Sequence, residues 1–156
     1  MTAAIAEQAA LPTKLDIGCG KMRYKDLITK KGKYIGLDLE EGKFTYSVKA
    51  DLYWDGIHIP LENNSVENVL LSEVLEHCPD PSISLNEAYR VMKKDGHILI
   101  TIPFLYQLHG IPYDFHRMTP FTIQNLLQAS GFTNIHIAPS GGFDASLAQM
   151  IGIWIT

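Results

Sequence analysis

The chain has 156 residues, enough for one domain with a substantial core but short for a complete α/β enzyme. Its formal net charge of −4 argues against a nucleic-acid partner, because affinity for phosphate backbones rests on Lys and Arg. Cys19 and Cys78 lie far apart and form no Cys-x-x-Cys pair, which favours free thiols in a reducing cytoplasm over a disulfide.

Residues 1–12 are predicted to form a loose or weakly helical N-terminal segment that ends at Pro12. The first ten residues hold no basic side chain, so the charged start of a signal peptide is missing. The longest apolar run, Ile151 to Ile155, has five residues, far below the roughly 20 that span a bilayer. We therefore expect a cytoplasmic protein without a membrane span and a single domain over residues 1–156.

Short apolar runs alternate with helical patterns along the rest of the chain. Asp80 and Thr119 each precede a proline, the arrangement of a helix N-cap followed by the first helical position. Gly96 and Gly131 are expected to end these two helices. Further helices are predicted over residues 21–31 and 143–154, and strands over 14–17, 34–37, 44–50, 66–71, 97–102 and 132–138. The alternation predicts a doubly wound, Rossmann-like α/β fold with a mostly parallel sheet.

A glycine loop directly follows the first predicted strand. Asp16, Gly18 and Gly20 are spaced like the start of a dinucleotide fingerprint, Gly-x-Gly-x-x-Gly. The position of its third glycine holds Arg23, which argues against an NAD-dependent oxidoreductase. A plain tight turn is the alternative interpretation. Asp38 ends the second predicted strand, where a carboxylate can accept both hydroxyl protons of a ribose, and a solvated loop acid is the alternative there.

Several further motifs carry a family resemblance. With the loop from Leu15 to Gly20, they resemble the type 11 family of class I S-adenosylmethionine-dependent methyltransferases over residues 14 to about 103. The motifs are Ile59-Pro60-Leu61, Asn63-Asn64-Ser65-Val66-Glu67-Asn68-Val69, Glu73-Val74-Leu75-Glu76-His77 and Arg90-Val91-Met92-Lys93-Lys94-Asp95-Gly96. Met22 and Asn68 depart from that pattern, since the family often has a glycine at the first position and an acid at the second.

The resemblance implies a cofactor, S-adenosylmethionine, with S-adenosylhomocysteine as product. It implies that Leu39 presses on the adenine ring, that Asp51 accepts from the adenine amino group and that the Leu52 N–H reaches a ring nitrogen. Ser72 and Glu73 are implied to face the methionine part. The full set of cofactor residues implied is Asp16, Gly18, Cys19, Gly20, Asp38, Leu39, Asp51, Leu52, Ser72 and Glu73. For Glu76 and His77, a hydrogen-bonded pair that braces the loop is the alternative to a role in the site.

The stretch from His109 to Thr119 holds two histidines, an aspartate, an arginine and two aromatic residues. Similar segments occur in bacterial members of the family, and such a loop suits a substrate lid. His116 is the first candidate for a general base toward a hydroxyl acceptor, with His109 and Asp114 beside it. Asp114 and Arg117 pairing to hold the loop is the alternative. The remaining histidines, His58, His97 and His136, show no ligand spacing around them, and no zinc or other metal site is expected.

The sequence therefore predicts a methyltransferase that acts on a small or medium-sized molecule. A catalytically weak or inactive methyltransferase-like binding module is the main alternative. Methyltransferases of this class end in a β-hairpin whose last strand enters the sheet, whereas residues 143–154 have helical spacing. We expect that last strand to be missing, leaving about six strands, an open edge and an exposed apolar helix. Such an edge favours a homodimer.

Overall fold

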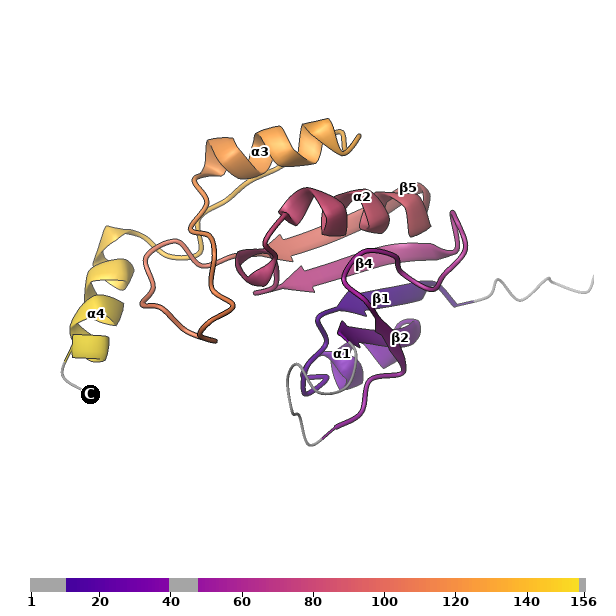
Figure 1. The fold of residues 1–156 in the computed structure, drawn as a ribbon, viewed down its shortest axis with the longest axis horizontal. Coiled ribbons are helices and arrows are strands. Elements are labelled where there is room, and N and C mark those ends of the chain that lie inside the picture. Colours follow the sequence, from indigo (N-terminus) through magenta and orange to yellow (C-terminus); the bar gives the residue numbers. More distant parts are fainter. Residues whose placement is uncertain (1–10, 40–47, 155–156) are drawn as a thin grey trace, which may run out of the picture.

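The sheet has five parallel strands in the order β3-β2-β1-β4-β5 (Figure 1). The computed structural model describes residues 11–39 and 48–154. The strands are β1 (Thr13–Ile17), β2 (Lys33–Leu39), β3 (Leu52–Trp54), β4 (Val66–Ser72) and β5 (Met92–Thr101). The predicted doubly wound α/β fold with a parallel sheet is confirmed.

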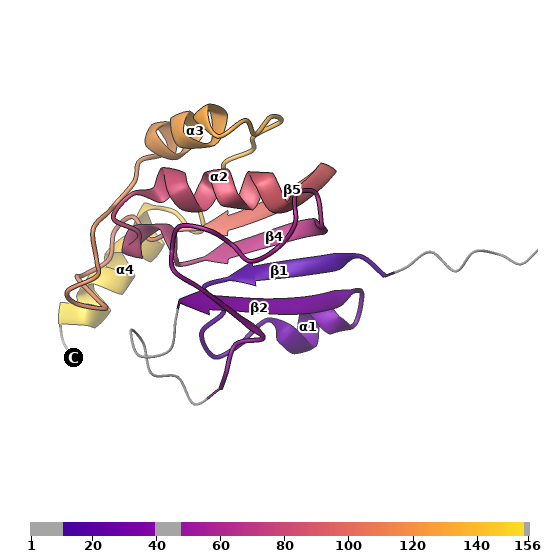
Figure 2. The ribbon, with the colours of Figure 1, turned by 45° about the vertical axis from the view of Figure 1, so that its right-hand side comes forward.

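Helices cover both faces of this sheet. The helical elements of the described residues are α1 (Lys25–Thr29), the 3-10 turn η1 (Leu75–His77), α2 (Pro81–Val91), α3 (Pro120–Ala129) and α4 (Phe143–Trp154). The helices α2 and α3 lie on one face, and α1 lies on the other face beside β2 (Figure 2). None of the helices in the described part of the chain is long and apolar enough to cross a bilayer.

The main core lies between the sheet and α2. Leu15, Ile17 and Leu71 from the central strands are at most 1% exposed, as are Leu85 and Ala88 of α2. Leu15 and Ile17 share one face of β1, whereas the buried Asp16 between them lies on the other face and accepts a hydrogen bond from Tyr34. A smaller cluster under α1 joins Cys19, Met22 and Tyr34.

Both predicted helix caps are present. The Asp80 side chain accepts from Ser82 N at 3.0 Å, and Thr119 Oγ1 accepts from Thr122 N at 3.2 Å. The first of these helices ends at Val91, five residues before the glycine expected to end it. Gly96 lies instead within β5, where a Cβ would stand 2.6 Å from the Glu67 carbonyl oxygen. Close approach of two backbones, not a helix end, requires this glycine.

The predicted third strand is misplaced. Residues 44–47 of it lie outside the described residues, and residues 48–50 form no strand. The strand of this region is β3, which begins after Asp51 instead of ending before it. Backbone bonding explains the shift, because Asp51 N donates to the Gly36 carbonyl at 2.9 Å and thereby starts the pairing with β2.

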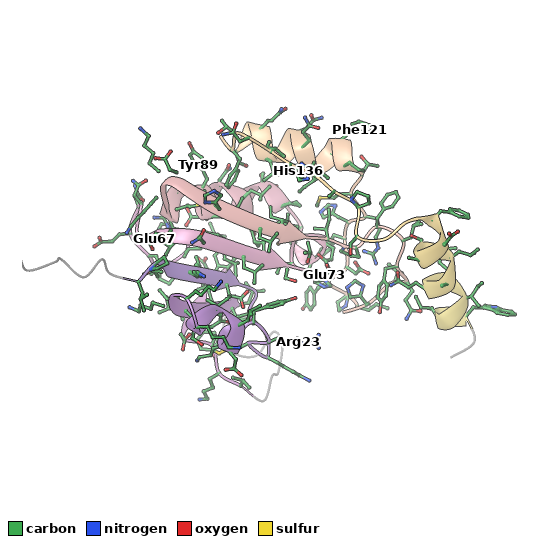
Figure 3. The ribbon with its side chains drawn as sticks, turned by 180° about the vertical axis from the view of Figure 1, so that it is seen from behind. Arg23, Glu67, Glu73, Tyr89, Phe121 and His136 are labelled. Atoms are coloured by element: carbon green, nitrogen blue, oxygen red, sulfur yellow. The ribbon has the colours of Figure 1, made fainter. Side chains whose placement is uncertain are left out.

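The prediction of a strand over residues 132–138, and with it a sheet of about six strands, is wrong. This segment runs without ladder hydrogen bonds, and β5 forms the edge of the sheet. Both line a groove of about 1770 Å³, so a gap separates them. Figure 3 shows this segment, with His136 labelled, beside β5. Residues 132–138 are rich in strand-favouring apolar side chains, but within the described part of the chain no strand pairs with them.

The strand order reverses between β1 and β4. From β1 the chain adds β2 and β3 on one side, and then β4 and β5 on the other. Sheets of this kind bind their ligands at such a reversal, outside the carboxyl ends of the strands. The loops after Ile17 and Ser72 flank this point.

Candidate active site

The glycine turn after β1 is fastened to the end of β2. Gly18 N and Cys19 N donate to the Leu37 carbonyl at 2.8 and 3.1 Å, and Gly20 N donates to Asp38 Oδ2 at 2.8 Å. Gly18 and Gly20 have φ angles of +69° and +49°, in the left-handed region that side chains disfavour. The two sequence features singled out for cofactor binding, the glycine turn and Asp38, therefore form one unit.

Gly18 also contacts the loop across the crevice. A Cβ on Gly18 would stand 2.5 Å from Val74 Cγ2, so no larger residue fits without moving Val74. Val74 follows Glu73, the residue labelled at the end of β4 in Figure 3. The loops after β1 and β4 thus touch directly at the reversal point.

Met22 stands where related methyltransferases often have a glycine. Its φ of +52° lies in the left-handed region, which explains that preference. Its side chain is only 8% exposed and packs with Cys19 and Tyr34. The space left by Gly36 accommodates it, because a Cβ there would stand 3.1 Å from Met22 Cε. The buried contacts of the Met22 side chain therefore offset the backbone strain at Met22 and stabilise this conformation of the loop after β1.

Asp38 has the geometry of a ribose ligand. Each carboxylate oxygen accepts one backbone N–H at 2.8 Å, Oδ2 from Gly20 and Oδ1 from Leu39. A carboxylate offers about four lone-pair sites, so capacity remains at each oxygen for a hydroxyl donor. Leu39, the next residue in the chain, and Leu52 on β3 are half-buried apolar side chains that pack against the main core. The residues present therefore fit the nucleoside part of S-adenosylmethionine.

Asp16 and Cys19 lie in a strongly acidic surrounding. Burial raises the pKa of Asp16 to about 6, although a hydrogen bond from Tyr34 at 2.7 Å acts in the opposite direction. Burial, with the nearby charges of Asp38, Asp16 and Asp51, raises the pKa of the Cys19 thiol to about 12. Cys19 is therefore a neutral thiol at neutral pH and no nucleophile.

The structure places Asp51 at the amino end of β3. Its Oδ2 accepts from Gly36 N at 2.8 Å, and Lys25 Nζ lies 3.7 Å from its Oδ1. Asp51 thus braces the middle of β2, while Asp38 stands at that strand's end.

A row of hydroxyl groups crosses the carboxyl edge. Ser72 Oγ lies 3.1 Å from Tyr24 Oη and 3.0 Å from Thr101 Oγ1. Glu73, with a φ of +55°, donates its N–H to the Thr101 carbonyl. Sequence reasoning missed Tyr24 and Thr101. Thr101 could have been found from its place at the end of a predicted strand.

The loop after β5 is held by an ion pair. Arg117 Nη1 and Nη2 lie 2.6 and 2.8 Å from the two oxygens of Asp114, which also accepts from His109 N at 2.9 Å. The Arg117 guanidinium keeps the pKa of Asp114 well below its usual range. Asp114 is therefore a permanent anion that shapes the loop and an unsuitable general base.

The two candidate histidines lie in different places. His109 Nε2 is 3.8 Å from Glu76 Oε1, whereas His116 Nε2 is 3.3 Å from the Pro79 carbonyl oxygen. Phe115 N and His116 N both donate to the Glu76 carbonyl, which fastens this loop to η1. His109, rather than His116, joins the buried polar group after β4.

Comparison with known proteins agrees with this geometry. Residues 15–100, more than half of the chain, match the sequence model of a family described as methyltransferase domain. The demethylmenaquinone methyltransferase of Staphylococcus epidermidis is 26% identical over 119 residues, which cover 65% of this chain and 49% of that protein. The malonyl-[acyl-carrier protein] O-methyltransferase of Yersinia pestis is 36% identical over 93 residues, covering 56% and 35%.

A similar fold occurs in a solved S-adenosylmethionine-dependent methyltransferase from Mesorhizobium loti. The TM-score is 0.67 at 17% identity, and the match covers 96% of this chain and 87% of that one. By contrast, the chain spans about half or less of the length of the two enzymes above.

Proposed function

Because the chain belongs to the methyltransferase domain family, we propose that it transfers a methyl group from S-adenosylmethionine to a small or medium-sized molecule. The observation that carries this proposal is the bonding of the glycine turn to Asp38 at the strand-order reversal. The demethylmenaquinone and malonyl-[acyl-carrier protein] methyltransferases support the choice of small acceptors.

We assign the cofactor to the crevice between the loops after β1 and β4. In this assignment Asp38 accepts the ribose hydroxyls, Leu39 and Leu52 flank the adenine, and Ser72 and Glu73 face the methionine part. The turn of Asp16, Gly18, Cys19 and Gly20 holds the backbone close to the ligand. Asp51 supports the adenine side through the strand that it braces.

The sulfonium of S-adenosylmethionine supplies an electrophilic methyl group when it is bound. The protein contributes alignment and exclusion of water, which can together lower a barrier by roughly 7–11 kcal/mol. A hydroxyl acceptor needs a base, and His109 and His116 are the candidates. Asp114 holds the loop that carries both histidines.

Isothermal titration with S-adenosylmethionine tests the assignment. The Asp38→Ala variant loses a charged hydrogen-bond acceptor, which typically costs about 1.5–3 kcal/mol, or roughly ten- to a hundred-fold in Kd. Asp26→Ala, on the exposed face of α1, is the matched control. Equal affinity of wild type and Asp38→Ala would overturn the role of Asp38.

Turnover separates an enzyme from a binding module. Formation of S-adenosylhomocysteine is measured with acceptors that begin with demethylmenaquinone and malonyl-[acyl-carrier protein] and extend to other phenols and carboxylates. Acceptor-dependent product supports the transferase. Tight cofactor binding without product across the panel would favour the binding module.

A further inference from the structure

Glu76 is a buried carboxylate without a hydrogen-bond donor. Its side chain is 1% exposed, and neither Oε1 nor Oε2 has a hydrogen-bond partner among the described residues. Buried polar groups are nearly always hydrogen-bonded, and buried charges are paired or bind a metal ion. The carboxylate therefore lacks a partner that a native structure ordinarily provides.

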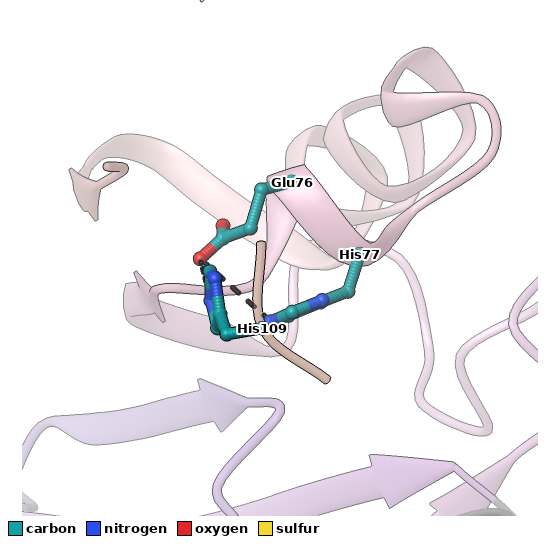
Figure 4. Close-up of side chains that lie close together, drawn as sticks. All are labelled: Glu76, His77 and His109. Carbon is teal, nitrogen blue, oxygen red and sulfur yellow. Dashed lines mark ion pairs between the residues drawn. The ribbon is translucent and has the colours of Figure 1, made fainter. Parts of the chain in front are cut away.

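Two imidazole rings converge on this carboxylate (Figure 4). The Nε2 atoms of His77 and His109 each lie 3.8 Å from Glu76 Oε1. The rings meet edge to face with centroids 4.9 Å apart, and one donor atom from each of the three residues fits within 4.8 Å of the others. Three potential ligand atoms thus surround one point.

The other nitrogen of each ring is already engaged. His77 Nδ1 bonds to the Tyr113 carbonyl. His109 Nδ1 lies 3.3 Å from the Gln107 carbonyl and 3.4 Å from Asp114 Oδ2, with Arg117 Nη2 also at 3.4 Å. Metal-binding histidines commonly donate the outer N–H to a carbonyl or carboxylate, which fixes the tautomer that leaves Nε2 free.

We propose that Glu76, His77 and His109 bind a divalent transition-metal ion of the zinc type. Two imidazoles and one carboxylate suit Zn²⁺, which binds such ligands at about 2.0–2.2 Å. In a tetrahedral site the ligand atoms would stand about 3.4 Å apart. The two observed Nε2–Oε1 distances of 3.8 Å exceed this spacing by about 0.4 Å, so metal binding requires both histidine side chains to move closer to Glu76.

Ion pairing with protonated histidines is the alternative explanation of this cluster. It would direct an N–H of each ring toward Glu76, yet 3.8 Å exceeds the reach of a hydrogen bond. A cation between the three groups satisfies all of them at once.

The site adjoins the crevice. Glu76 and His77 belong to the same short loop as Val74, which contacts the position of Gly18. Three protein ligands leave at least one coordination position for a water molecule or an acceptor oxygen, and with His109 Nε2 bound to the ion, His116 is the remaining candidate base. The use of that position by an acceptor rests on the proposed function, whereas cation binding does not.

Titration of the purified, metal-stripped protein with Zn²⁺ at pH 7.5, without cofactor or acceptor, tests the proposal. We expect one equivalent to bind, and Co²⁺ to give the visible absorption of a site with nitrogen ligands. Glu76→Gln, His77→Ala and His109→Ala should each weaken Zn²⁺ binding at least tenfold. His136→Ala is the matched control, because His136 is exposed on the extended segment beside β5.

Circular dichroism establishes that each variant is folded. If Glu76→Gln fails to fold, His109→Ala decides, because this side chain is 31% exposed and its backbone bond to Asp114 survives. Failure of the wild type to bind one equivalent would overturn the proposal. So would equal affinity in wild type, His109→Ala and His136→Ala. Titration with S-adenosylmethionine is separate, so either proposal can fail without the other.

Discussion

Tyr34 donates its hydroxyl hydrogen to Asp16 Oδ2 across 2.7 Å, joining the first two strands on the face that α1 covers. Both side chains are buried, and Asp16 is 2% exposed. An ionisable carboxyl in such a place makes the stability of the protein depend on pH.

Asp16→Asn should remove that dependence. Burial raises the folded-state pKa of Asp16 from 3.8 to about 6, so the native state holds this proton more tightly than the unfolded state does. The stabilising contribution is therefore present below about pH 4 and lost as pH rises through 6. Wild type should lose roughly 2–3 kcal/mol relative to Asp16→Asn between pH 4 and 7. Urea denaturation at several pH values measures this difference.

Tyr34→Phe provides the complementary measurement. The hydrogen bond from Tyr34 lowers the pKa of Asp16, so its loss should move the transition to higher pH. Asp26→Asn, an exposed acid on α1, serves as control. Identical pH profiles for wild type and Asp16→Asn would show that Asp16 titrates normally in the folded protein.

Substitutions of Met22 should reverse the usual order of alanine and glycine. Met22→Ala deletes buried contacts with Cys19 and Tyr34 while keeping a Cβ at positive φ, and should cost about 2–4 kcal/mol. Met22→Gly loses the same contacts but relieves about 1 kcal/mol of backbone strain. Chemical denaturation should therefore find Met22→Gly the more stable of the two. The opposite order would mean that the left-handed conformation is unstrained.

Loss of the Asp114–Arg117 pair should loosen the loop without shifting a catalytic pKa. Asp114→Asn and Arg117→Lys both break the two-point contact, and Lys lacks the planar fork of Arg. Limited proteolysis should cut residues 104–118 several-fold faster in both variants. The pH dependence of turnover should keep its midpoint. A shifted midpoint in Asp114→Asn would restore Asp114 as a candidate base.

The apolar surface of α4 should promote self-association. No described residue of this helix is buried, and Phe143 and Trp154 are 78% and 86% exposed. Light scattering should detect dimers or larger species at high protein concentration. Leu147→Glu should dissociate them, while Gln149→Glu on the same helix controls for added charge. A monomeric wild type at all concentrations would refute this expectation.

The sequence predicted the parts of the fold that depend on local chemistry. Two helices were predicted from their caps, Asp80 and Thr119. The strands β1, β2 and β4 were predicted from their apolar runs. In each case residues close together in the sequence carry the signal. The same logic placed the glycine turn and Asp38 each at a strand end, whereas the hydrogen bond that joins them came only from the structure. Contacts between residues far apart in the sequence could not be predicted in this way.

The errors share that origin. Residues 132–138 have the composition of a strand, but a strand also requires a neighbour, which its own sequence does not reveal. His109 lies 32 positions after His77, so no ligand spacing indicated that both meet Glu76. The contact of His116 with the Pro79 carbonyl was likewise not predictable, because only the folded loop brings the two together, and the choice of His116 as first candidate base stays a prediction.

The parallel pairing of β1 with β4 has a consequence for assembly. It joins Lys14 to Asn68, a wider separation in the chain than any other pairing of the sheet. Contacts between residues so distant in the chain form late in folding, because the chain loses the entropy of loop closure before these contacts contribute stabilising free energy. The crevice lies across this same pair, so neither β1–β3 nor β4–β5 contains all of the residues proposed to bind the cofactor. A ligand that spans the crevice must therefore stabilise the folded state, in which β1 is paired with β4, over states in which the two halves of the sheet are separate.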